Sequence, residues 1–162
     1  MAVGIFGFFK MRSPRVVKVV ATYEESADQV FEGALRFSEM MEAMSGLAVY
    51  KGLPDEAVQE GATYVVDVTF WKLFTVKGHT MHIELLDRSG RVLQSREHAP
   101  GIRRWDHTLS VQPRDGRTEW RDTVFIDAGW RTPFIARFAT YLYRRRHKHR
   151  QALSITSDLR HV

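Results

Sequence analysis

From Leu47 onward, apolar residues recur at every second position, and turn residues divide the sequence into short segments with this period. Successive side chains of a β-strand point to opposite faces, so the pattern is typical of strands with one buried face. The strand candidates are LAVYKG, ATYVVDVTFW, KGHTMHIELLD, VLQSREH, RWDHTLSVQ and TEWRDTVFID. Ser-Gly and Asp-Gly connections favour tight hairpins, so we expect antiparallel strands that neighbour one another in chain order.

One more strand and two short helices precede this series. Residues 15–22, RVVKVVAT, are rich in β-branched side chains and predict a strand. Ser26 and Gln29 have the spacing of a capping box, which predicts a helix over residues 27–37. A second short helix is predicted over residues 38–44, and a glycine then ends it.

A long amphipathic helix closes the chain. Thr132 suits an N-cap and Pro133 suits the first helical position. Apolar residues then recur three and four apart as far as Leu142, so the first half of the helix is expected to pack on the core. The run RRRHKHR follows at 144–150, where the apolar stripe thins and the helix dipole favours cations. We therefore expect this end of the helix to extend past the sheet into solvent.

The composition is that of an ordinary globular domain of 162 residues with a net charge of +5. The absence of cysteine excludes disulfides, thiolate metal sites and cysteine nucleophiles. No apolar run approaches the roughly 20 residues that span a bilayer. We expect one cytoplasmic domain over residues 15–155, preceded by an arm at 1–14 and followed by a tail at 156–162.

The register of the first hairpin follows from which pairing separates apolar from polar side chains. A three-residue loop that ends in a left-handed Gly90 pairs Ile83 with Ser95 and Leu85 with Leu93. A two-residue turn would instead place Ile83 opposite an arginine. The three-residue loop is therefore the prediction.

The register of the second hairpin brings two polar residues onto an apolar face. A two-residue Asp-Gly turn at 115–116 pairs His107 with Val124 and Leu109 with Asp122. His107 and Asp122 then become diagonal neighbours within reach of each other. Such a pair is costly in apolar surroundings unless it is hydrogen-bonded, so we expect that bond.

This pair supplies the catalytic candidates. A carboxylate beside an imidazole fixes its tautomer and raises its basicity, as general-base chemistry requires; the alternative is a structural hydrogen bond in a core or cavity wall. No serine is placed as a nucleophile against His107 and Asp122. The segment HTMHIE puts His79 and His82 on opposite strand faces, so no metal site is predicted, and no phosphate-binding glycine loop indicates a cofactor.

The basic run is a candidate surface for an anionic partner. A nucleic-acid module usually spreads its cations over a face and interleaves them with stacking aromatics, and this chain does neither, so nucleic acid is disfavoured. A peripheral contact with an anionic membrane stays open beside the solvated helix end. The cations are Arg144, Arg145, Arg146, Lys148 and Arg150.

The order of one strand, two short helices, six strands and a long helix resembles the START-like, or SRPBCC, superfamily with its helix-grip fold, and most closely its bacterial polyketide cyclase/dehydrase-like branch. The segments that carry the resemblance are VVKVVATYEESADQVFEGAL, RRWDHTLSVQP, WRDTVFIDAGW and TPFIARFATYLYRRRHKHR, within residues 15–153. The resemblance implies an α+β fold with a curved seven-stranded antiparallel sheet, a C-terminal helix over its concave face, and a deep apolar cavity between them. Some relatives are cyclases or aromatases and others only bind or carry hydrophobic molecules, and no family-wide catalytic motif exists to transfer.

The implied architecture and the assigned faces together predict a ligand-binding set on the sheet and the long helix: Trp105, His107, Leu109, Trp120, Asp122, Val124, Phe134, Phe138, Tyr141 and Leu142. The leading hypothesis is a cavity that binds a lipid, polyketide or quinone-like molecule. The alternative is a cyclase, dehydratase or hydrolase acting on a carbonyl-containing substrate, with His107 as base and Asp122 orienting it. The third hypothesis is a surface interaction through residues 144–150.

Overall fold

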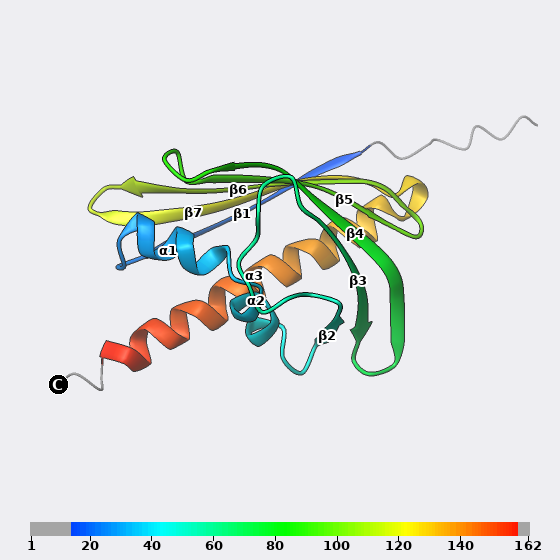
Figure 1. The fold of residues 1–162 in the computed structure, drawn as a ribbon, viewed down its shortest axis with the longest axis horizontal. Helices are drawn as coiled ribbons and strands as arrows, with labels where there is room; N and C mark the ends of the chain where they lie inside the picture. The colour runs from blue at the N-terminus through cyan, green and yellow to red at the C-terminus, as the bar shows by residue number, and fades with distance from the viewer. Residues whose placement is uncertain (1–13, 159–162) are drawn as a thin grey trace, which may run out of the picture.

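The computed structural model describes residues 14–158, so residues 1–13 of the predicted arm and residues 159–162 of the predicted tail lie outside the described residues. Its element order matches the predicted one (Figure 1). The long helix continues to Asp158, past the predicted domain boundary at residue 155. The elements are β1 (Arg15–Tyr23), α1 (Ala27–Ala34), α2 (Phe37–Ala43), β2 (Ala48–Lys51), β3 (Thr63–Phe70), β4 (Phe74–Asp87), β5 (Val92–Ala99), β6 (Ile102–Arg114), β7 (Arg117–Asp127), the 3₁₀ turn η1 (Gly129–Arg131) and α3 (Thr132–Asp158).

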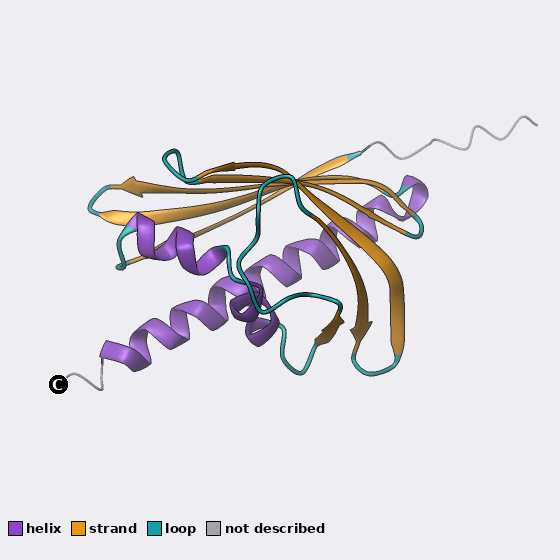
Figure 2. Ribbon diagram, in the orientation of Figure 1, coloured by secondary structure: helices purple, strands orange, loops and turns teal. Residues whose placement is uncertain are grey.

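The strands form one antiparallel sheet in the order β1-β7-β6-β5-β4-β3-β2. Strands β2 to β7 pair in chain order, and only β1 crosses over, to pair with β7. Register shifts interrupt the β3–β4, β4–β5 and β5–β6 pairs, and such bulges bend the strands that carry them. The sheet therefore curves, and α3 lies along its concave side with α1 and α2 (Figure 2). No helix among residues 14–158 combines the length and apolarity needed to span a bilayer.

The second hairpin confirms the predicted register: His107 lies opposite Val124 and Leu109 opposite Asp122. The turn residues Asp115 and Gly116 have φ values of 50° and 77°, as a two-residue turn of this kind requires. This register fixes His107 and Asp122 on the concave side of the sheet.

The first hairpin follows its prediction only in part. Ile83 does lie opposite Ser95, but a bulge after Ile83 shifts the end of β4, so that Leu85 pairs with Gln94 rather than with Leu93. Gly90 is not the residue in the left-handed region; Arg91 is, with φ 52°. A Cβ at Gly90 would crowd the carboxylate of Asp87, which accepts from the Gly90 amide at 2.8 Å, so a larger residue would displace that side chain.

Of the two predicted helix N-caps, one is confirmed and the other is wrong. Ser26 and Gln29 form the predicted capping box at α1. Thr132 is not an N-cap: its backbone is helical, and its hydroxyl donates to the Gly129 carbonyl at 2.7 Å and accepts from the Ala128 amide at 2.9 Å. Because η1 directly precedes α3, the Thr132 hydroxyl links η1 to α3 and does not cap the helix.

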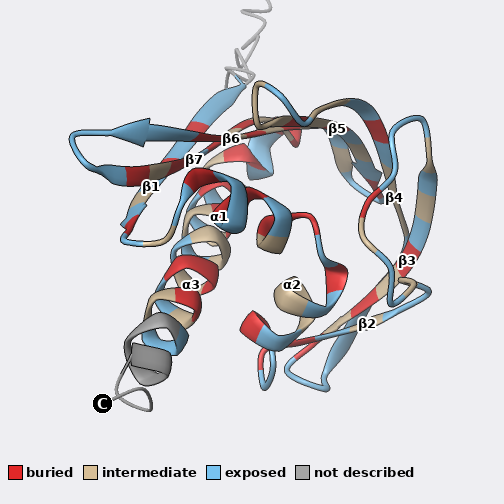
Figure 3. Cartoon of the chain, turned by 60° about the vertical axis from the view of Figure 1, so that its left-hand side comes forward, coloured by how far each residue is buried: buried red, intermediate tan, exposed pale blue. Residues whose placement is uncertain are grey.

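The basic second half of α3 corrects the expectation of a solvated helix end. Arg146, His147 and Arg150 are buried, as Figure 3 shows for the inner side of α3. Arg146 donates to the carbonyl of Ala34, the last residue of α1, at 2.8 Å, and Arg145 donates to that of Ala43, the last residue of α2, at 3.1 Å. Cations favour helix C-termini because the terminal carbonyls lack intrahelical partners. These arginines therefore anchor the two short helices to α3.

Two carboxylates complete this anchoring. Glu39 accepts from Arg146 at 2.6 Å, and Glu25 accepts from Arg150 at 3.1 Å. Arg146 and Arg150 are consequently not free for the membrane contact that the sequence left open. Of the five cations in the run, Arg144 and Lys148 are exposed.

We predict that Ile83→Ala lowers the free energy of unfolding by about 2–5 kcal/mol, because it empties a fully buried position of the core. Leu73→Ala is the matched control. Leu73 is 84% exposed, so its truncation should change stability by no more than about 0.5 kcal/mol. Urea denaturation of both variants checks this, and equal losses would contradict the assigned core.

Candidate functional site

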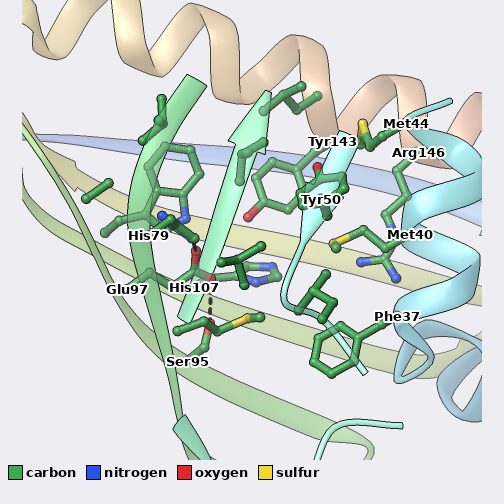
Figure 4. A pocket seen from close by; sticks show the side chains of 18 of the residues that line it. Phe37, Met40, Met44, Tyr50, His79, Ser95, Glu97, His107, Tyr143 and Arg146 are labelled. Atoms are coloured by element: carbon green, nitrogen blue, oxygen red, sulfur yellow. Dashed lines mark hydrogen bonds and ion pairs between the residues drawn. The ribbon is translucent and has the colours of Figure 1, made fainter. Parts of the chain in front are cut away.

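A cavity of about 330 Å³ lies between the concave face of the sheet and α3 (Figure 4). Its lining comes from α1, α2, strands β2 to β6 and α3, so every layer of the fold contributes to it. Most of the lining is apolar, with a small group of polar side chains. This composition is typical of small-molecule sites, in which apolar walls supply burial and a few polar groups fix orientation.

The structure brings only part of the predicted ligand-binding set to the cavity. Five members line it: Trp105, His107, Leu109, Phe138 and Leu142. Three are fully buried but lie outside the lining: Trp120, Asp122 and Val124. Phe134 and Tyr141 are 64% and 48% exposed, because the inner face of α3 is rotated relative to the assumed one and carries Ile135, Phe138 and Leu142.

The predicted bond between His107 and Asp122 is present. Asp122 accepts from Nε2 of His107 at 2.8 Å and from Nε2 of His147 at 2.9 Å. Burial raises the pKa of Asp122, but the hydrogen bonds and charges of the two imidazoles outweigh it and hold that pKa far below its ordinary value. The carboxylate is therefore ionised and accepts both bonds.

This geometry assigns the protons. Because an ionised carboxylate only accepts, both histidines carry a proton on Nε2. Nδ1 of His147 lies 2.7 Å from the hydroxyl of Tyr23 and is hydrogen-bonded to it. The ring of His107 lines the cavity, and its Nδ1 has no hydrogen-bond partner among the described residues. Sequence reasoning missed His147, because only tertiary packing places this helical residue against a strand carboxylate.

A second polar cluster was also missed. Glu97 accepts from Nε2 of His79 at 3.0 Å and from the Ser95 hydroxyl at 2.8 Å, and all three residues line the cavity. Burial raises the pKa of Glu97, but the hydrogen bond from His79, the nearby imidazoles and Ser95 outweigh it and lower that pKa. The alternation that places Ser95 on the concave face also places Glu97 there, so the signal was present in the sequence.

Two phenols and a guanidinium complete the polar lining. The ring of Tyr143 lies 4.9 Å from that of His107, and Figure 4 shows Tyr143, Tyr50 and Arg146 around the same space. Burial raises the pKa of Tyr50 to about 12 and that of Tyr143 well above its ordinary value, so both phenols stay protonated. Burial lowers the pKa of Arg146, but Glu39 outweighs it, so the guanidinium stays charged. The cavity thus offers both acceptors and donors.

The histidines of HTMHIE separate as predicted. His79 lines the cavity, whereas His82 bonds Thr63 at 2.9 Å on the other face. Among residues 14–158, no three histidine, aspartate or glutamate side chains gather in a way that could hold a metal ion.

Comparison with solved structures identifies the architecture. Protein CV1439 from Chromobacterium violaceum superposes with a TM-score of 0.67 at 11% identity, covering 86% of this chain and 96% of that one. Ara h 8.0201 gives 0.62 at 7% identity over 85% and 97% of the two chains. The Zhui aromatase/cyclase from Streptomyces sp. R1128 gives 0.55 at 19% identity over 71% and 68%.

The chain has the helix-grip fold. The resemblance to START-like, or SRPBCC, proteins is thereby confirmed at the level of the fold, including the curved sheet of seven strands and the long C-terminal helix packed on it. No family model matches the sequence, and no curated protein matches it either. The helix-grip fold typically encloses a hydrophobic cavity, and the described residues of this chain enclose a cavity with a mostly apolar lining.

We predict that Asp122→Asn destabilises the fold by roughly 3–5 kcal/mol, because it removes a buried charge that two imidazoles bind. The pKa of Asp122 is lowered on folding from an unfolded value of about 3.9, so its ionisation stabilises the folded chain above that pH. This contribution is lost as the pH falls through the unfolded value toward the folded one. Denaturation at a series of acidic pH values should therefore show that the free energy of unfolding of the variant falls less steeply as the pH decreases.

Asp115→Asn is the control for this measurement. The substitution is the same, but the Asp115 side chain is 95% exposed in a hairpin turn. This substitution should leave the decrease in the free energy of unfolding at acidic pH unchanged. Equal behaviour of the two variants would show that Asp122 is not the group responsible.

Proposed function

We propose that this protein binds a hydrophobic or amphipathic small molecule, such as a lipid, a polyketide or a quinone-like compound, in the cavity under α3. The observation that carries the proposal is an apolar cavity of about 330 Å³ with its few polar groups converging on the same space. Each 100 Å² of apolar ligand surface removed from water contributes about 2.5 kcal/mol before ordering costs. The apolar walls would therefore supply affinity.

The polar groups would orient the bound molecule. His107 and Glu97 present acceptors, and Tyr50, Tyr143 and Arg146 present donors. A ligand with carbonyl and hydroxyl groups at one end would add partners for these groups, including the Tyr50 hydroxyl, which has no other partner among the described residues, whereas a pure hydrocarbon would add none. The proposed ligand is accordingly amphipathic.

We predict that Val66→Phe weakens the binding of a fluorescent anilinonaphthalenesulfonate or fatty-acid probe by roughly 10–100-fold, because the larger ring overfills the cavity wall. Val65→Phe is the control, since the neighbouring Val65 is 59% exposed on the other face of β3. Native mass spectrometry of protein purified without denaturation identifies any bound compound. Equal affinity of the two variants for the probe would contradict binding in this cavity.

A second function is acid–base catalysis on a carbonyl-containing substrate. It is favoured by the hydrogen bond that Nε2 of His107 donates to Asp122, because this bond orients a ring that lines the cavity and leaves its Nδ1 for a substrate. In this version His107 removes a proton from the bound substrate, and Asp122 stabilises the imidazolium that forms. A cyclase, dehydratase or hydrolase would use this step.

We predict that His107→Ala lowers turnover of a substrate in this class by about 10²–10⁴-fold, the usual contribution of a positioned general base. Probe binding should weaken far less, since most of the cavity wall is unchanged. Progress curves on the compound identified by mass spectrometry measure this. Full turnover by His107→Ala would contradict the catalytic proposal, whereas it would not contradict the binding function.

A further inference from the structure

The outward face of α3 carries aromatic and cationic side chains along one stripe. Phe134, Arg137, Tyr141, Arg144 and Lys148 are exposed and follow one another at intervals of three or four residues. This spacing places them on one side of a helix with 3.6 residues per turn. From residue 132 to 157 the chain contains no acidic residue, so the stripe has one sign of charge.

The turn between β3 and β4 extends the apolar part of this surface. Trp71 and Phe74 are about half exposed, and Leu73 is 84% exposed. The ring of Trp71 lies 5.9 Å from that of Phe138, which in turn lies 6.5 Å from that of Tyr141. Turn and helix therefore form one aromatic surface. We call Trp71, Leu73, Phe74, Phe134 and Tyr141 the aromatic patch.

The aromatic patch adjoins the cavity. Phe74 and Phe138 line the cavity and also contact the exposed Trp71. A cluster of exposed large apolar side chains is unusual on a soluble domain and marks an interaction surface.

We propose that this face, made of the aromatic patch and the cations Arg137, Arg144 and Lys148, docks on the surface of an anionic membrane. Aromatic side chains suit the boundary between headgroups and acyl chains, and cations suit the negative potential of anionic lipids. Within residues 14–158, none of the three cations forms an ion pair, in contrast to Arg146 and Arg150 on the inner face. Their charge is therefore available to lipid phosphates.

A protein partner fits the surface less well. The apolar core of a protein interface is depleted in charge, whereas here aromatics and cations alternate from Phe134 to Arg144. An interfacial arrangement of apolar and basic side chains is instead the pattern of helices that lie on membranes. The docked face would bring the aromatic rim of the cavity to the lipid.

The first test compares vesicles of pure phosphatidylcholine with vesicles that contain equal amounts of phosphatidylcholine and phosphatidylglycerol. Sedimentation should show binding to the anionic vesicles that weakens as salt is added. Arg144→Gln with Lys148→Gln should weaken that binding by roughly thirtyfold, since each cation near such a surface contributes about 1 kcal/mol. Arg15→Gln with Lys18→Gln removes the same charge from exposed positions on β1 and should leave binding within about twofold.

The second test addresses the aromatic patch. Phe134→Ser with Tyr141→Ser should weaken binding by about tenfold or more, whereas Val16→Ser with Val65→Ser, at exposed positions on β1 and β3, should not. The tryptophan emission should shift to the blue on anionic vesicles, and Trp71→Phe should reduce that shift, with Trp130 as the other tryptophan that is largely exposed. The fluorescence measurement needs only the parent protein and the single variant Trp71→Phe, so it can be made even if a double variant unfolds.

Three outcomes would overturn the proposal. The first is equal binding to neutral and anionic vesicles, and the second is an equal loss in the control variants. The third is no vesicle binding together with a concentration-dependent dimer in the ultracentrifuge that Phe134→Ser and Tyr141→Ser abolish. That last result would assign the face to self-association.

Discussion

The contact between the basic turn of α3 and the ends of the two short helices determines how the rest of the molecule is arranged. Short helices such as α1 and α2 are marginal on their own, because few of their backbone groups are paired internally. The guanidinium groups of Arg145 and Arg146 bind the carbonyls of Ala43 and Ala34 and hold both helices against α3. Since α1 and α2 supply part of the cavity wall, the cavity depends on these bonds. Arg146 itself lies in that wall, so one side chain both anchors a helix and faces the ligand space.

The Asp122 network joins the same helix to the sheet. His147 comes from α3 and His107 from β6, and one buried carboxylate on β7 accepts from both. A change in the packing of α3 would alter the bond to His147, and through the shared carboxylate of Asp122 it would alter the bond to His107. The orientation of His107 in the cavity wall is thus tied to the packing of the helix above it.

The sequence was sufficient for the architecture because strand alternation and turn chemistry are local. Alternation identified six of the seven strands, β-branched residues identified the first, and the Asp-Gly turn fixed the register that joins His107 to Asp122. The β4–β5 bulge was not predictable in this way, since a bulge inserts a residue without changing composition. Neither was the burial of Arg146 and Arg150, because their acceptors lie more than 100 residues away in the chain. Glu97 was within reach of the alternation argument, but an acidic side chain was not expected inside an apolar wall.

On the inner side of α3 the cations bind groups of the protein, and on the outer side they are exposed. This difference bears on how a ligand could enter the cavity. Opening the cavity by lifting the basic half of α3 would break the bonds of Arg145 and Arg146 to helix ends and leave buried charges without partners, which costs several kcal/mol per group. Phe74 and Phe138 line the cavity near the aromatic patch and make no hydrogen bonds, so displacing their rings breaks none. A route between the β3–β4 turn and the first half of α3 would therefore cost less than one under the basic half. Such a route would open on the proposed membrane face, because the aromatic patch lies there.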